Sequence, residues 1–162
     1  MTRTIRDALF PSTPSERRAQ LQEQFGRHLV EARNRMAAVV LERLAGTRRH
    51  PVPLVNRVVD QVRALEPATR EAVARVVMDA ADEIVMGILN LFASGNDAEM
   101  DGFVVNYAIL AQIRKPESDE ILEEVDINRG EPLVVIWNQY RKWLTRYCPS
   151  HLRTASLSSP GD

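Results

Sequence analysis

The chain has 162 residues, of which 44% are hydrophobic and 27% are charged, which is a globular composition and not a disordered one. This length is enough for one domain with a sizeable core. The single cysteine excludes an internal disulfide, and no apolar run approaches the roughly 20 residues of a membrane span. The sequence therefore predicts a cytoplasmic protein that does not insert into a membrane.

Three helices are expected in the first part of the chain. Thr13-Pro14-Ser15-Glu16 is a capping box, so the first helix is predicted from there to Leu44, with a stop at Gly46. A short second helix is predicted over 54–65, and Pro67 starts the third, which ends at 94–97. The third helix is apolar on most sides from residue 84 to 92, so it is expected to be the central and most buried one.

Beyond residue 102 the hydrophobic period changes from helical spacing to two. Alternation from Phe103 to Ile113 predicts one strand, residues 115–118 supply a turn, and Ile121, Val125 and Ile127 mark a second strand. Pro132 then starts a last helix, which Pro149 ends. The predicted fold is a mainly helical α+β single domain with three N-terminal helices, a β-hairpin and a C-terminal helix. Its bounds are 13–148, between a flexible N-terminus, 1–12, and a disordered tail, 149–162.

Charge is distributed unevenly along the chain. Residues 1–63 carry 12 arginines and 6 acidic residues, whereas residues 97–131 carry 10 acidic and 3 basic residues. The segment 117–126 alone holds six carboxylates. It is either a surface that attracts a basic partner or a solvated strand whose like charges prevent edge-to-edge aggregation. Period two places Glu120, Glu124 and Asp126 on one face, and these are the expected partner contacts.

The last helix carries seven large side chains on one face: Leu133, Ile136, Trp137, Tyr140, Trp143, Leu144 and Tyr147. The aromatic members are either an interface anchor or core residues packed under the hairpin. Trp137 and Trp143 lie at opposite edges of the stripe. Trp143 is the candidate anchor for a partner, and Trp137 is expected to be buried.

Other chemistries have weaker support. Asp79, Asp82, Glu83 and Asn90 form a polar strip on the third helix, but no histidine joins them, so no metal site and no cofactor are predicted. Cys148 and His151 lack further zinc ligands or an orienting group. The arginines of the first helix scatter over several faces, which disfavours nucleic-acid binding. Phosphate loops and hydrolase motifs are absent, so no catalytic residue is assigned.

Residues 81–92, the acidic hairpin and the ending Trp137-x-x-Tyr140-x-x-Trp143-x-x-x-Tyr147 are similar in composition to small bacterial immunity proteins, which neutralise a partner toxin. This resemblance covers about half the chain and implies a non-enzymatic inhibitor. It transfers no functional residue, because it includes no diagnostic motif.

The leading hypothesis is an intracellular protein-binding module whose partner has a basic surface, in the manner of an immunity protein. One alternative is a small-ligand or sensor protein with a pocket between the last helix and the hairpin. Another is a nucleic-acid-associated protein that uses the arginine-rich half. A homodimer is left open, and the hypothesis includes no enzymatic activity.

Overall fold

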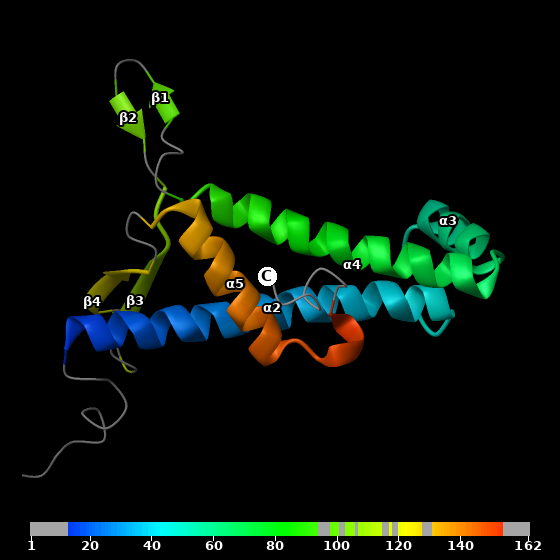
Figure 1. Ribbon diagram of the computed structural model, residues 1–162, viewed down its shortest axis with the longest axis horizontal. Coiled ribbons are helices and arrows are strands. Elements are labelled where there is room, and N and C mark those ends of the chain that lie inside the picture. Colours follow the sequence, from blue (N-terminus) through cyan, green and yellow to red (C-terminus); the bar gives the residue numbers. More distant parts are fainter. Residues whose placement is uncertain are drawn as a thin grey trace, which may run out of the picture.

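The computed structural model describes residues 13–93, 98–100, 103–105, 107–114, 117, 120–127 and 131–153. These residues form four α-helices, one short 3-10 helix and two antiparallel two-stranded hairpins (Figure 1). The protein is a mainly helical α+β single domain, which confirms the predicted fold class. No helix among the described residues is long and apolar enough to cross a membrane.

The longest element is helix α2 (Pro14–Ala45), with 32 residues. The Thr13 hydroxyl oxygen accepts a hydrogen bond from the Glu16 amide at 3.3 Å, and the Glu16 carboxylate accepts one from the Thr13 amide. This capping box is the predicted one. The helix ends at Gly46, whose φ of 83° is readily adopted by glycine. Both ends of α2 are therefore encoded locally.

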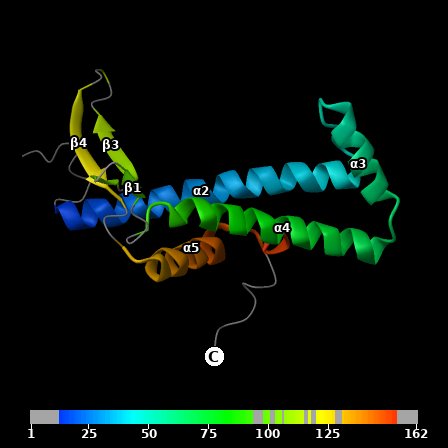
Figure 2. The ribbon, with the colours of Figure 1, turned by 90° about the horizontal axis from the view of Figure 1, so that it is seen from above.

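Helix α4 (Pro67–Asn90) returns antiparallel to α2, and the short helix α3 (Pro53–Arg63) connects them (Figure 1). Helix α5 (Leu133–Tyr147) packs against both long helices on one side, and hairpin β3–β4 lies near the start of α2 on the other (Figure 2). The core forms where α2, α4 and α5 meet. Its members include Val30, Ala37, Met78, Met86, Leu89, Ile136, Tyr140, Trp143 and Leu144.

A buried ion pair lies at this junction. The Arg33 side chain, only 1% exposed, donates to both carboxylate oxygens of Asp82, at 2.8 and 2.9 Å. The Tyr140 hydroxyl donates to Asp82 at 2.9 Å, and Arg33 also donates to the Leu152 carbonyl at 2.7 Å. Burial is the main reason why the pKa of Tyr140 is raised. One hydrogen-bonded cluster thus joins α2, α4, α5 and the 3-10 helix η1 (Ser150–Leu152).

A second polar contact joins α2 to α5. The Glu23 carboxylate accepts hydrogen bonds from Tyr147 Oη at 2.5 Å, from Trp143 Nε1 at 3.1 Å and from Arg146. The bond from Tyr147 is the main cause of the lowered pKa of Glu23. Beside it, the Trp143 indole packs on Gly26, where a Cβ atom would lie 2.0 Å from the ring. Glycine inside α2 is therefore a requirement of the packing.

The prediction that the third helix is the most buried one is wrong. Ile84 and Ile88 of α4, and Leu91 directly after it, are exposed, and only Met78, Met86 and Leu89 are buried within the helix. Helices α2 and α5 both pack on the Asp82 side of α4, and α3 also contacts it, but Ile84 and Ile88 on the opposite side stay exposed. Apolar composition on most sides of a helix does not show which side has a neighbour.

The predicted strand over 103–113 is divided into two. Strand β2 (Phe103–Val105) pairs with β1 (Ala98–Met100), which the sequence analysis did not predict. Strand β3 (Leu110–Arg114) pairs with β4 (Ile121–Asp126). A signal for the first hairpin exists: Met100 pairs with Phe103, and the two residues between them are Asp-Gly, a favoured hairpin pair.

The predicted disordered tail begins too early. Leu152 is buried, and the Arg153 side chain donates to the carbonyls of Cys148 and Thr145 at 2.9 and 2.7 Å. The carbonyl of Leu152 is also needed by buried Arg33. Residues 149–153 therefore belong to the folded domain. The predicted flexible segment 1–12 and the rest of the tail, 154–162, lie outside the described residues.

Candidate protein-interaction site

Strand β4 has one inner and one outer face. Val125 and the following Ile127 are buried, and the Ile127 amide donates to the Ile109 carbonyl at 2.9 Å. Glu123 lies on the same inner face and forms an ion pair with Arg17 of α2 at 2.9 Å. The hairpin is thus held against the start of α2 by Val125, by this ion pair and by the hydrogen bond from Arg18 to the Ile127 carbonyl at 3.4 Å.

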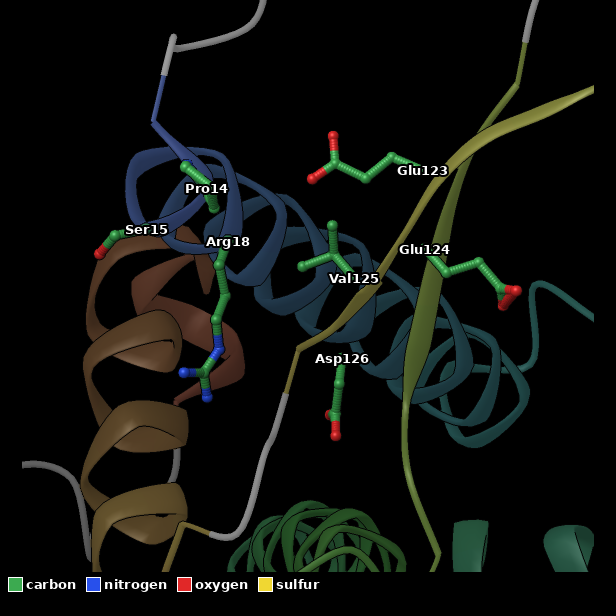
Figure 3. A pocket seen from close by; sticks show the side chains of 7 residues that line it. All are labelled: Pro14, Ser15, Arg18, Glu123, Glu124, Val125 and Asp126. Carbon is green, nitrogen blue, oxygen red and sulfur yellow. The ribbon is translucent and has the colours of Figure 1, made fainter.

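Of the three carboxylates predicted as partner contacts, Glu124 and Asp126 lie on the other face, whereas Glu120 directly precedes β4. Glu120 and Glu124 are exposed, and Asp126 is half-buried. Glu124 is opposite Gln112 of β3 and accepts a hydrogen bond from its amide at 3.4 Å. Figure 3 shows Val125 directed at α2 and Glu124 directed away from it. Period-two reasoning therefore placed Glu124 and Asp126 correctly with respect to Val125.

A cavity of about 470 Å³ lies between the start of α2 and β4 (Figure 3), and its lining consists of Pro14, Ser15, Arg18, Glu123, Glu124, Val125 and Asp126. Arg18 donates to the Ile127 carbonyl at 3.4 Å and lies 3.5 Å from a Glu131 oxygen. The lining therefore holds three carboxylates and the Arg18 guanidinium, and one of the carboxylates, Glu123, is already paired with Arg17. Such a surface suits a cationic side chain, and it contains no nucleophile paired with a base.

Sequence reasoning missed the part of this site that α2 provides. Pro14, Ser15 and Arg18 belong to the first turns of the helix, far from β4 in the sequence. The cavity lies beside α2, whereas the alternative small-ligand pocket was predicted between the last helix and the hairpin, and that alternative stays a prediction. Only long-range pairing of the hairpin with α2 creates it, and no local pattern encodes that pairing.

The predicted anchor Trp143 lies inside the core. It is 4% exposed, it stacks edge-on with Phe25 at 6.1 Å between ring centroids, and its indole nitrogen bonds Glu23. It therefore offers no surface to a partner in this fold. The tryptophan that reaches the surface is Trp137, which is 38% exposed.

Replacing Trp137 with alanine is expected to lower the free energy of unfolding by about 1–2 kcal/mol. Full burial of a tryptophan would make the loss about 3–5 kcal/mol, but more than a third of Trp137 is already in water. Urea denaturation of the two proteins measures the difference. A loss as large as that of Trp143→Ala would show that Trp137 is a full member of the core.

Other candidate groups are already used by the fold. Asp82 pairs with Arg33, and burial raises the pKa of the Cys148 thiol, which makes it a weak nucleophile. Within the described ranges, no group of three histidine, cysteine or acidic residues could hold a metal ion. Many arginines of the first half are in ion pairs with acidic residues of the chain: Arg17, Arg27, Arg33, Arg48, Arg49 and Arg63. These arginines are therefore partly neutralised within the chain.

Comparison with known proteins adds no further information about this site. No family model matches the chain, and neither the curated proteins nor the solved structures include a match. The class of protein is therefore defined by the fold and the site alone: a mainly helical α+β domain with a carboxylate-lined cavity between a helix start and a hairpin.

Proposed function

We propose that this protein is a non-enzymatic protein-binding module whose partner has a basic surface. The observation that carries the proposal is the exposure of Glu120, directly before β4, and of Glu124, on the outer face of β4, beside a cavity that is itself lined by carboxylates. Complementary charge of this kind steers association and fixes the orientation of the partner. A lysine or arginine of the partner would enter the cavity between α2 and β4.

The chemistry of the cavity favours binding over catalysis. Its polar side chains are carboxylates, the Ser15 hydroxyl and one guanidinium that is already hydrogen-bonded to Ile127 and close to Glu131. General acid–base catalysis needs a titratable group placed at a reacting atom, and nucleophilic catalysis needs an activated nucleophile. The ion pair between Arg17 and Glu123 holds the hairpin against α2, so the surface is preorganised for a partner.

The finer form of the proposal is that the module acts in the cytoplasm as an immunity-type inhibitor of a basic toxin. It rests on the compositional resemblance and on the acidic face. Inhibition would be steric and electrostatic, because the module would cover a cationic surface that the toxin needs. Crosslinking in cells, followed by identification of the linked polypeptide, would name the partner.

The double variant Glu120→Lys, Glu124→Lys tests the acidic face. We expect it to fold with an unchanged denaturation midpoint, because both side chains are exposed and one source of like-charge repulsion is relieved. Association with the basic partner should become slower by roughly tenfold or more at low salt, and the difference should shrink as salt is added. Stopped-flow or surface-based kinetics at several salt concentrations measure both effects.

The matched control is Glu42→Lys, Glu66→Lys. It makes the same change in net charge at two exposed positions far from β4, one near the end of α2 and one directly before α4. Equal slowing by both double variants would show that only net charge matters. Unchanged kinetics in the β4 variant would mean that the acidic strand serves solubility, and the proposed function would lose its support.

A further inference from the structure

The outer face of α4 is apolar and uncovered. Val76, Ile84, Ile88 and Leu91 are 65, 64, 51 and 54% exposed, while Asp82 on the opposite side faces the core. Along most of its length no other described element lies over this side of the helix (Figures 1 and 2). Large contiguous apolar patches are rare on the surfaces of monomeric proteins and mark sites of association.

The apolar face has a seven-residue period. Val77, Ile84 and Leu91 are separated by seven residues, and Ala80 and Gly87 follow the first two of them at a spacing of three. This is the spacing of the two seam positions of a coiled coil, with large residues at one position and small residues at the other. The pattern of α4 therefore suits pairing with a second helix.

Gly87 is the second, independent observation. Glycine inside a helix is less favourable than alanine, so it needs a reason. At Gly26 the reason is within the chain, because the Trp143 ring occupies the place of a Cβ atom. At Gly87 a Cβ atom would meet nothing within 4 Å. The single protein gives no cause for the missing side chain, whereas close approach of a second helix would.

We propose that α4 forms an antiparallel pair with α4 of a second copy of this chain. In the register that interleaves the seam, Ile84 faces Ala80 of the second copy and Val77 faces Gly87 of the second copy. A large side chain then meets a small one in these two layers, which gives interdigitated packing, and the next layer pairs Leu91 with Val73 of the second copy. A parallel pair would place Ile84 on Ile84 and leave a gap between two glycines. The sequence of the face is thus self-complementary only in the antiparallel arrangement.

The surface available makes this a weak dimer. Four half-exposed side chains together with the backbone at Ala80 and Gly87 would bury roughly 800–1,000 Å² in total, at the low end for specific association. Glu83 flanks the seam, and the two-fold axis brings Glu83 of both copies together, so like charges weaken the pair further. The inference does not rest on the proposed function, because α4 and the outer face of β4 are separate surfaces.

Sedimentation equilibrium of the full chain, from micromolar to millimolar concentration, tests the proposal. We expect a monomer–dimer equilibrium that Ile84→Lys abolishes. The matched control is Met36→Lys, which places the same charge at an exposed apolar residue of α2 and should leave the equilibrium unchanged. A wild-type chain that stays monomeric throughout, or equal loss in both variants, would overturn the proposal and leave α4 to a different partner.

Gly87→Ala distinguishes close helix packing from nonspecific hydrophobic association. The added methyl group has free space in the monomer, so the thermal midpoint at low concentration should rise. In the dimer it would meet Val77 of the second copy, and the dissociation constant should increase about tenfold or more. Association that is unchanged or tighter in this variant would contradict the proposed seam.

Disulfide trapping tests the direction of the helices. Glu83→Cys should give a covalent dimer on mild oxidation, because the two-fold axis of the antiparallel pair brings both copies of this position together. The native Cys148 is buried and should not crosslink, so the wild-type chain is the control. In a parallel pair the two residues at position 83 lie on opposite flanks. A dimer that resists trapping would therefore contradict the antiparallel arrangement.

Discussion

Asp82→Ala is expected to lower the free energy of unfolding by about 3–5 kcal/mol, which is the usual cost of breaking a buried ion pair. The substitution leaves the Arg33 guanidinium in the core without its carboxylate, and Tyr140 loses the acceptor of its hydroxyl. Arg33 keeps three neutral oxygen acceptors, the Leu152 carbonyl at 2.7 Å, Asn34 Oδ1 at 3.2 Å and the Met78 carbonyl at 3.4 Å. Neutral acceptors alone do not compensate a buried positive charge. Urea denaturation followed by circular dichroism measures the loss.

The control for this prediction removes both charges. In Arg33→Met, Asp82→Leu the core is apolar at both positions, and no ion is left unpaired. Replacement of a buried ion pair by packed hydrophobic residues is often neutral or stabilising. We therefore expect the double variant to be more stable than Asp82→Ala. A single variant with wild-type stability would show that water reaches Arg33 and that the pair is not buried in solution.

Gly26→Ala is expected to destabilise the protein by about 1–3 kcal/mol, although alanine is the better helix former. The new Cβ atom would lie 2.0 Å from Cδ2 and Cε2 of Trp143, so either the indole ring or the two helices must move. Movement of the ring would also weaken its hydrogen bond to Glu23, now at 3.1 Å. Thermal denaturation of the variant measures the combined cost.

Gly87→Ala is the matched control for this prediction, because it makes the same change inside α4 where the Cβ atom has open space. At low protein concentration it should raise stability by about 0.5–1 kcal/mol. Combining Gly26→Ala with Trp143→Leu should recover part of the loss, since the coupling of the two residues is steric. If Gly26→Ala were stabilising, α5 would not pack on α2 as closely as in this structure.

These two predictions concern features whose structural roles the sequence analysis did not predict. Within its own helix, Gly26 is only an unfavourable helix former, and Asp82 was one member of the predicted polar strip. Both interpretations used the residue and its neighbours in the same helix. The role of each depends on a residue more than 45 positions away, namely Trp143 and Arg33. The local sequence around a glycine or an acidic residue does not show which distant residue it contacts across a helix–helix interface.

The sequence by itself determined the helices and most of their starts, whereas α4 ends at Asn90, before the predicted stop at 94–97. The capping box at Thr13, the stop at Gly46 and the prolines at 53, 67 and 132 are local signals, because caps and proline act within one turn of the chain. It also determined which face of β4 carries Glu124, since side chains alternate along a strand.

The tertiary structure alone decided which apolar faces became core. Helix α4 has enough hydrophobic residues for two faces, and contact with α2 and α5 covered only the one that holds Asp82. In the same way, Trp143 became core and Trp137 stayed partly exposed, although both belong to one stripe. The physical reason is that burial of a face depends on which elements pack together. The helical period of the sequence shows only that a face is apolar.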